Sequence, residues 1–189
     1  MECLSLLEQF FNNQSVGAFV GAFAAFMLVV LNDWRRDRRR VRSIKNELKM
    51  NLAHAQGKLQ TLRSNRAAMR EHNKVMPSTI IKFNTGYIRQ IAAEVLDSFS
   101  PDQRRAIDAI CYTMEATDGF LEEAYTLAKT FQTALGQAER IANAESLLTE
   151  YGDGIVNLKR LIEMCENYVG ERYAIIVTKQ YDREAYEEK

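Results

Sequence analysis

Residues 16–31 read VGAFVGAFAAFMLVVL, an uninterrupted run of apolar and small side chains that contains no charged group. At the helical rise of about 1.5 Å per residue, this run extends about 24 Å, slightly less than the hydrocarbon core of a bilayer. Trp34 follows at the place where membrane helices carry an interfacial aromatic residue. The sequence therefore predicts a transmembrane helix over residues 16–34, with a buried core helix as the alternative.

A dense cluster of arginines follows the apolar run and argues against the core helix, since a buried helix gains nothing from such a cluster at one end. The positive-inside rule places this basic flank in the cytoplasm, so we expect the N-terminus outside and the remainder inside. A cleaved signal peptide carries its bases before the apolar run, and here they follow it. The helix is therefore expected to stay as a single-pass anchor. The cluster comprises Arg35, Arg36, Arg38, Arg39, Arg40 and Arg42.

The apolar run has two unlike faces when it is drawn as a helix of 100° per residue. One face is bulky and contains Phe19, Phe23 and Phe26. Small residues let two helix backbones approach closely inside a bilayer, so the other face is a candidate for self-association into a homo-oligomer. Composition is the alternative reason, because membrane helices are rich in small residues. The small face contains Gly17, Gly21, Ala24 and Ala25.

A basic stalk is predicted after the anchor, over residues 35–74. Residues 34–74 hold 13 Lys or Arg against three acids, a net charge of +10 in a chain that is neutral overall. An apolar seam with spacings of three and four runs along the stalk, as in a coiled coil. The seam packs either against the same chain or against a second copy. It consists of Ile44, Leu48, Leu52, Ala55, Leu59 and Leu62.

Breakers and capping residues divide residues 75–183 into several helices. Pro77 ends the stalk, because proline lacks an amide donor and disfavours helix in the residue before it. The run SPDQ at 100–103 is the clearest helix start, with a serine cap, a proline in the first turn and a capping-box glutamine. The sequence YGDG at 151–154 predicts a turn. The expected helices cover residues 87–97, 101–135, 137–150 and 155–181.

This pattern predicts an all-α fold, in which one N-terminal transmembrane helix continues into a long basic stalk helix packed with a cytoplasmic antiparallel helical bundle. The helical period places Leu121, Tyr125 and Leu135 inward on one bundle helix, and Ile175 and Ile176 inward on the last. The run 174–178 is β-prone and is the one place where a strand competes. Residues 1–15 are expected as an outer interfacial segment and residues 184–189 as a loose tail.

Several basic residues of the stalk lie too far from the membrane for lipid to explain them. Lys58 stands about 36 Å beyond Trp34 at helical rise, several times the Debye length of about 8 Å. These side chains either pair with residues 75–189, whose 12 bases and 19 acids give a net charge of −7, or bind an anion. If the anion were part of a nucleotide, an aromatic side chain that stacks on its nucleobase would have to be Tyr87, Tyr112 or Tyr125. The candidate anion-binding residues are Lys58, Arg63, Arg66, Arg70 and Lys74.

A search for catalytic chemistry gives no candidate. The sequence has no phosphate-binding glycine loop, dinucleotide fingerprint, zinc-protease motif or nucleophile elbow. Its three cysteines, Cys3, Cys111 and Cys165, stand far apart, which predicts neither a metal centre nor a disulfide framework. We therefore expect no enzyme activity, no metal and no cofactor.

The span at 16–31, the arginine stop at 35–42 and the helical bundle behind them resemble the layout of small membrane effectors of bacterial anti-phage systems. The resemblance is one of architecture and transfers no site residue. It implies a homo-oligomer in the bacterial inner membrane, whose cytoplasmic bundle senses a signal and whose spans assemble or rearrange to permeabilise or depolarise the membrane. The signal would be an anionic nucleotide, a nucleic acid or a partner protein. The alternative is a membrane-tethered scaffold that docks a cytoplasmic partner without forming a pore.

Overall fold

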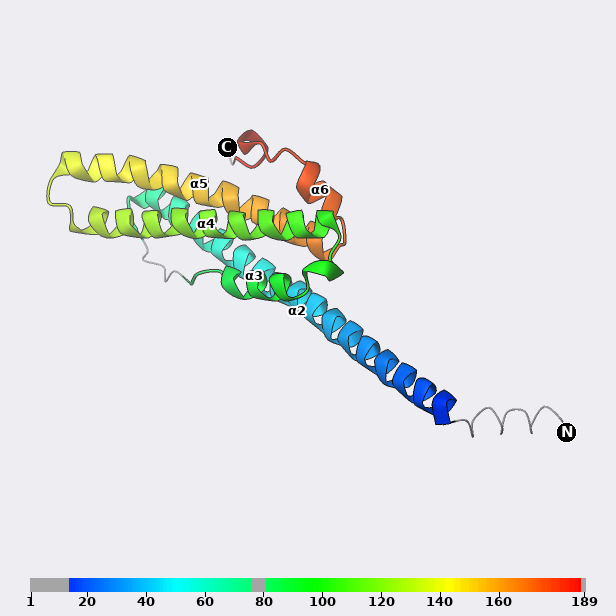
Figure 1. The fold of residues 1–189 in the computed structure, drawn as a ribbon. Helices are drawn as coiled ribbons and strands as arrows, with labels where there is room; N and C mark the ends of the chain where they lie inside the picture. The colour runs from blue at the N-terminus through cyan, green and yellow to red at the C-terminus, as the bar shows by residue number, and fades with distance from the viewer. Residues whose placement is uncertain (1–13, 76–80, 188–189) are drawn as a thin grey trace. The chain divides into compact units, whose positions relative to one another are not determined.

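Every regular element in residues 14–75 and 81–187, which the computed structural model describes, is helical, so the all-α prediction is confirmed. The expected interfacial residues 1–13, Cys3 and the helix stop at Pro77 lie outside these described ranges. The elements, shown in Figure 1, are α2 (Gln14–His72), α3 (Thr85–Glu94), the 3-10 turn η1 (Leu96–Ser98), α4 (Pro101–Thr133), α5 (Gln137–Val169), α6 (Tyr173–Thr178) and the 3-10 turn η2 (Arg183–Ala185).

The chain divides into two compact units, residues 1–40 and residues 41–189, and helix α2 contributes residues to both. The sequence predicts a boundary at residue 34, whereas the structure divides at residue 40, so most of the expected stalk, residues 41–74, belongs with the bundle. The first unit contains one long apolar helical segment, of the kind that anchors a protein in a membrane or serves as a signal sequence. None of its most apolar 18-residue window is buried within the structure.

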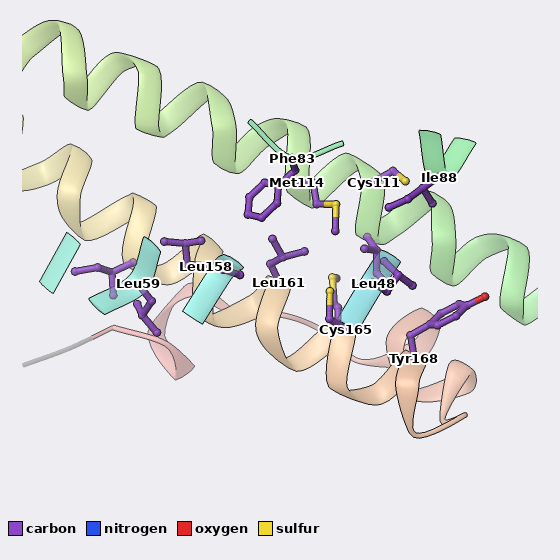
Figure 2. Close-up of a cluster of buried hydrophobic side chains, with 14 of the residues drawn as sticks. Leu48, Leu59, Phe83, Ile88, Cys111, Met114, Leu158, Leu161, Cys165 and Tyr168 are labelled. Carbon is purple, nitrogen blue, oxygen red and sulfur yellow. The ribbon is translucent and has the colours of Figure 1, made fainter. Parts of the chain in front are cut away.

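The core of the second unit forms where the apolar seam of α2 packs against α3, α4 and α5. Ile44, Leu48, Ala55, Leu59 and Leu62 are all buried, and only Leu52 of the predicted seam is half-buried. The seam therefore packs against its own chain. Figure 2 shows three of the core side chains from different helices directed toward one another, namely Leu48 of α2, Met114 of α4 and Leu161 of α5.

Helix α4 begins as its capping sequence predicts. The Ser100 hydroxyl accepts a hydrogen bond from the Gln103 amide at 3.2 Å, and the Gln103 side chain accepts one from the Ser100 amide at 2.8 Å. Two amide groups that the helix itself leaves unpaired are satisfied in this way. Helix α4 then runs antiparallel to α5, and the connection between the two helices is short (Figure 1).

The predicted turn at 151–154 is wrong, because α5 continues through it without a break. Gly154 is buried inside the helix, and a Cβ added there would lie 3.0 Å from Cδ1 of Leu62. The glycine therefore leaves room for the Leu62 side chain between α5 and α2, and it lies in a packed helix rather than in a turn. Instead of reaching residue 181, the helix ends at Val169, ahead of Gly170.

Four further expectations for residues 75–189 differ from the structure. Leu135 is fully exposed, because it lies in the connection after α4 rather than on the helix. Ile175 is also exposed, since the β-prone run forms the short helix α6, which directs Ile176 inward instead. Leu121 and Tyr125 are half-buried. The expected loose tail contains a buried side chain, Tyr186.

Candidate functional site

Two of the five candidate anion-binding residues, Arg66 and Arg70, come together at one pocket of the second unit. They stand four residues apart on α2, so their side chains leave the same face of the helix. Arg63 and Lys74 are exposed and do not line this pocket, and Lys58 lies elsewhere in an ion pair. A candidate anion site in this pocket therefore includes only two of the five residues that the sequence suggested.

Three segments that are distant in sequence form the pocket, which has a volume of about 350 Å³. Helix α2 contributes Arg66 and Arg70 to one wall. The residues around η2 contribute Arg183 and Glu187 to a second wall. Helix α5 forms the third wall with Leu148, Thr149, Gly152 and Val156.

The arginines of the pocket differ in how their charges are compensated. Arg183 pairs with Asp153 and donates from Nε to Glu187 at 2.8 Å. Among residues 14–75 and 81–187, no acidic side chain pairs with Arg66 or Arg70. Both guanidinium groups line the pocket, so a bound anion would balance their charges.

Gly152 of α5 lies beside Arg66 in the pocket lining. A Cβ added at this glycine would lie 3.8 Å from the Nη2 atom of Arg66, which is ordinary van der Waals contact. The Thr149 hydroxyl on the neighbouring turn donates to the carbonyl of Glu145 at 3.0 Å. Gly152 and Thr149 thus form the part of the α5 wall that lies beside Arg66.

Lys58 takes part in a shielded polar network instead of the pocket. Its Nζ lies 3.0 Å from Oδ1 of Asp118, and the two side chains are only 12% and 11% exposed. The other oxygen of Asp118 accepts a hydrogen bond from the Phe83 amide at 2.8 Å, and Nζ of Lys58 also lies 3.8 Å from the centre of the Phe83 ring. Burial lowers the pKa of Lys58, and the hydrogen bond to Asp118 opposes that shift. This pair ties α2 to α4.

A second polar network holds the C-terminal segment that forms one wall of the pocket. The Glu163 carboxylate of α5 accepts hydrogen bonds from Lys179 and from the Tyr186 hydroxyl. Lys159 donates to the Tyr186 carbonyl at 2.9 Å. The ring of Tyr186 is buried, so this network fixes the chain close to Arg183 and Glu187.

The pH dependence of stability tests this second network. Burial alone would raise the pKa of Glu163, but the hydrogen bonds from Lys179 and Tyr186 outweigh it and lower the pKa from the ordinary 4.5. A carboxyl group with a lowered folded-state pKa stabilises the fold above its ordinary pKa, and that contribution is lost as the pH falls through the lowered value. Thermal unfolding of wild type should therefore lose more stability on acidification from about pH 6 to about pH 3 than the Glu163→Gln variant loses.

The control for this comparison is Glu166→Gln, which changes an exposed acid on the same helix. It should retain the wild-type acid dependence. Equal acid sensitivity of wild type and Glu163→Gln would contradict the assignment.

Neither a metal cluster nor a reactive thiol is found in the described part of the chain. No group of three or more metal-ligating side chains occurs among those residues. Burial raises the pKa of Cys111 to about 11 and that of Cys165 to about 12, so both thiols stay protonated at neutral pH. A protonated, enclosed thiol is a poor nucleophile.

The candidate self-association face of the first unit is open along its length. Gly17, Gly21, Ala24 and Ala25 are exposed, and a Cβ added at either glycine would meet no atom within 4 Å. The bulky face is exposed too, with Phe19, Phe23 and Phe26 between 57% and 73% accessible. Within one chain, both faces of this helix are therefore unpacked.

Most arginines of the cluster that follows the apolar run are exposed as well. Arg38 lies 4.0 Å above the Trp34 ring, and Arg40 is 3.9 Å from Asp37. These contacts join residues three or four positions apart on the same helix. The remaining members, Arg35, Arg36, Arg39 and Arg42, are exposed.

Sequence patterns do not reveal the pocket residues or the Lys58 partner that come from distant segments. Arg183 and Glu187 lie at the end of the predicted bundle and in the predicted tail, and nothing in their local pattern relates them to Arg66. Asp118 was one of many acids on the bundle. Its only local sign was a carboxylate on the inward period of α4, between Met114 and Leu121.

No protein-family model, no curated protein and no solved structure matches this chain.

Proposed function

We propose that this protein is a homo-oligomeric, single-pass membrane effector of bacterial anti-phage defence. Its cytoplasmic helical unit senses a signal, and its membrane helices assemble or rearrange to permeabilise or depolarise the inner membrane. The observation that carries the proposal is the apolar segment at 16–31, which has none of its most apolar window buried and is followed by an arginine collar. An exposed apolar surface of this length is unfavourable in water and favourable in the hydrocarbon core of a bilayer.

The two units support different parts of the proposal. The second unit buries its stalk seam in its own core, so that seam is not available as a coiled-coil interface with another copy. Self-association is therefore assigned to the small face of the first unit, where close helix packing in lipid is favourable. Because the span contains no ionisable side chain, a water-filled path requires several copies and a rearrangement.

Membrane potential measured in induced bacterial cells tests the effector function. Full-length protein should depolarise the inner membrane on induction or on phage infection, as followed with a voltage-sensitive dye. The double variant Gly17→Leu, Gly21→Leu should lose this effect, because bulky side chains separate the packed helices. The matched control is Val30→Phe, which adds bulk to the opposite side of the helix and should depolarise like wild type.

One observation favours a second candidate function, a membrane-tethered scaffold. The connection between α4 and α5 exposes Leu135 fully, and Ile141 is 55% exposed on the first turns of α5. Exposed apolar side chains close in sequence are suited to docking a partner protein. A potential that stays unchanged in cells with and without phage rules out the effector. If cells that carry the Gly17→Leu, Gly21→Leu variant still resist phage while their membrane potential stays unchanged, the scaffold function is favoured.

A further inference from the structure

We infer that the pocket between α2, α5 and η2 is a binding site for the phosphate group of a small molecule, such as a phosphomonoester or a pyrophosphate. The site lies wholly within the second unit. It gives the proposed effector its signal, and in that role it rests on the proposed function. The binding itself is a separate property of the chain.

The donor chemistry of the pocket selects phosphate. Guanidinium groups present planar pairs of N–H donors that match the oxygen spacing of phosphate and carboxylate. Arg66 and Arg70 supply two such groups from one helix face, and Arg183 supplies a third from η2. Three guanidinium groups against the single carboxylate of Glu187 give the lining a net positive charge, which favours an anion.

The position of Arg66 and Arg70 in the pocket indicates where the anion sits. Both side chains line the cavity, and neither has an acidic partner among the described residues. The neighbouring Gly152 adds no side chain beside the guanidinium of Arg66. An oxyanion placed between the two arginines would therefore accept charge-assisted hydrogen bonds from both guanidinium groups.

Glu187 acts as an internal competitor for the ligand. Its carboxylate lines the pocket and accepts from Nε of Arg183 at 2.8 Å, so it occupies one edge of the third guanidinium. Both side chains are more than half exposed, which makes this pair weak and easily exchanged. A phosphate that displaces Glu187 can bind the freed edge of the Arg183 guanidinium, while the ion pair between Arg183 and Asp153 stays in place.

The dimensions and the lining favour a small molecule over a polymer. A volume of about 350 Å³ lies within the range of small-molecule sites. The lining contains no aromatic side chain, and Tyr87, Tyr112 and Tyr125 are not part of it. Single-stranded nucleic acid is usually held by aromatic stacking along an extended groove, and this pocket offers neither feature.

Calorimetric titration of the full chain tests the inference. The protein is kept in a maltoside detergent and a phosphate-free buffer, so that no lipid headgroup supplies phosphate. Inorganic pyrophosphate and adenosine 5′-monophosphate should each bind saturably at one site per chain, and adenosine should not bind. Loss of one charged hydrogen-bond donor weakens binding by about 10- to 100-fold, so Arg70→Gln and Arg66→Gln should each show a loss of that size.

Three further variants sharpen the assignment. Glu187→Gln should tighten pyrophosphate binding by about two- to fivefold, because it removes the competing charge. Arg105→Gln on α4 and Glu184→Gln in η2 change exposed charges outside the pocket and should leave binding unchanged. Arg70 is exposed, so its substitution leaves the fold intact even if the Arg66 variant unfolds.

Several results would overturn the inference. These are the absence of saturable binding by both phosphate probes, or an equal loss of affinity in Arg105→Gln and Arg70→Gln. Binding of a single-stranded RNA 20-mer or of phosphatidic acid micelles, in place of the small phosphates, would overturn it as well. If the protein depolarises the membrane but binds no phosphate, only the proposed phosphate site is refuted. If it binds phosphate but does not depolarise the membrane, only the proposed function is refuted.

Discussion

Replacing Lys58 by Met is expected to lower the free energy of unfolding by about 3–5 kcal/mol, the usual cost of leaving a buried charge without its partner. Asp118, only 11% exposed, would keep its charge while losing the ammonium group that now lies 3.0 Å away. Water cannot replace that cation without opening the packing of α2 against α4. Urea unfolding of the full chain in detergent, followed by circular dichroism, measures the loss.

The double variant Lys58→Met, Asp118→Asn is the control for this prediction. Asparagine carries no charge, yet its side-chain oxygen can still accept the hydrogen bond from the Phe83 amide. Most of the lost stability should therefore return in the double variant, because a buried pair replaced as a whole is often neutral. A double variant as unstable as Lys58→Met alone would show that the aliphatic stem of Lys58, rather than the charge pair, holds the helices together.

Introducing an arginine at the centre of the apolar segment is the second large prediction. Phe23 lies midway along residues 16–31, and an arginine at the middle of a membrane helix raises the insertion free energy by about 3 kcal/mol. A span this short has little apolar surplus to offset that cost. Phe23→Arg should therefore move the protein out of the carbonate-resistant membrane fraction, as measured by immunoblotting.

Two controls separate charge from position in this experiment. Asn32→Arg adds the same side chain beside the existing arginine collar, where the headgroup region accommodates it, and should stay in the membrane fraction. Phe23→Leu keeps the centre apolar and should also stay. Wild-type protein that washes out with carbonate would refute the membrane assignment itself.

The helical fold was predictable where local sequence decides it. The run SPDQ at 100–103 contains its own cap, and the seam from Ile44 to Leu62 has the helical period. The glycines near residue 153 misled the prediction, because glycine is ambiguous on local grounds. Only the approach of Leu62 from a distant part of the chain shows that Gly154 serves helix packing.

The sequence predicted the α2 residues of the candidate site but not those from the C-terminal segment. Arg66 and Arg70 could be singled out because they lie beyond the reach of membrane electrostatics, and that argument needs only helical rise and the Debye length. Arg183 could not be found, since more than 100 residues separate it from Arg70 and its placement depends on the docking of Tyr186. Likewise, nothing in the sequence selected Asp118 as the partner of Lys58 from among the acids of the bundle.

The two enclosed thiols give the protein a built-in stability probe. Cys111 and Cys165 are both fully shielded, so a maleimide dye can reach them only when the helices separate. In a Cys3→Ser background, the labelling rate at low reagent occupancy would report the population of the opened state directly. Such labelling needs no denaturant, so each charge-pair variant could be compared under the conditions in which the protein is folded.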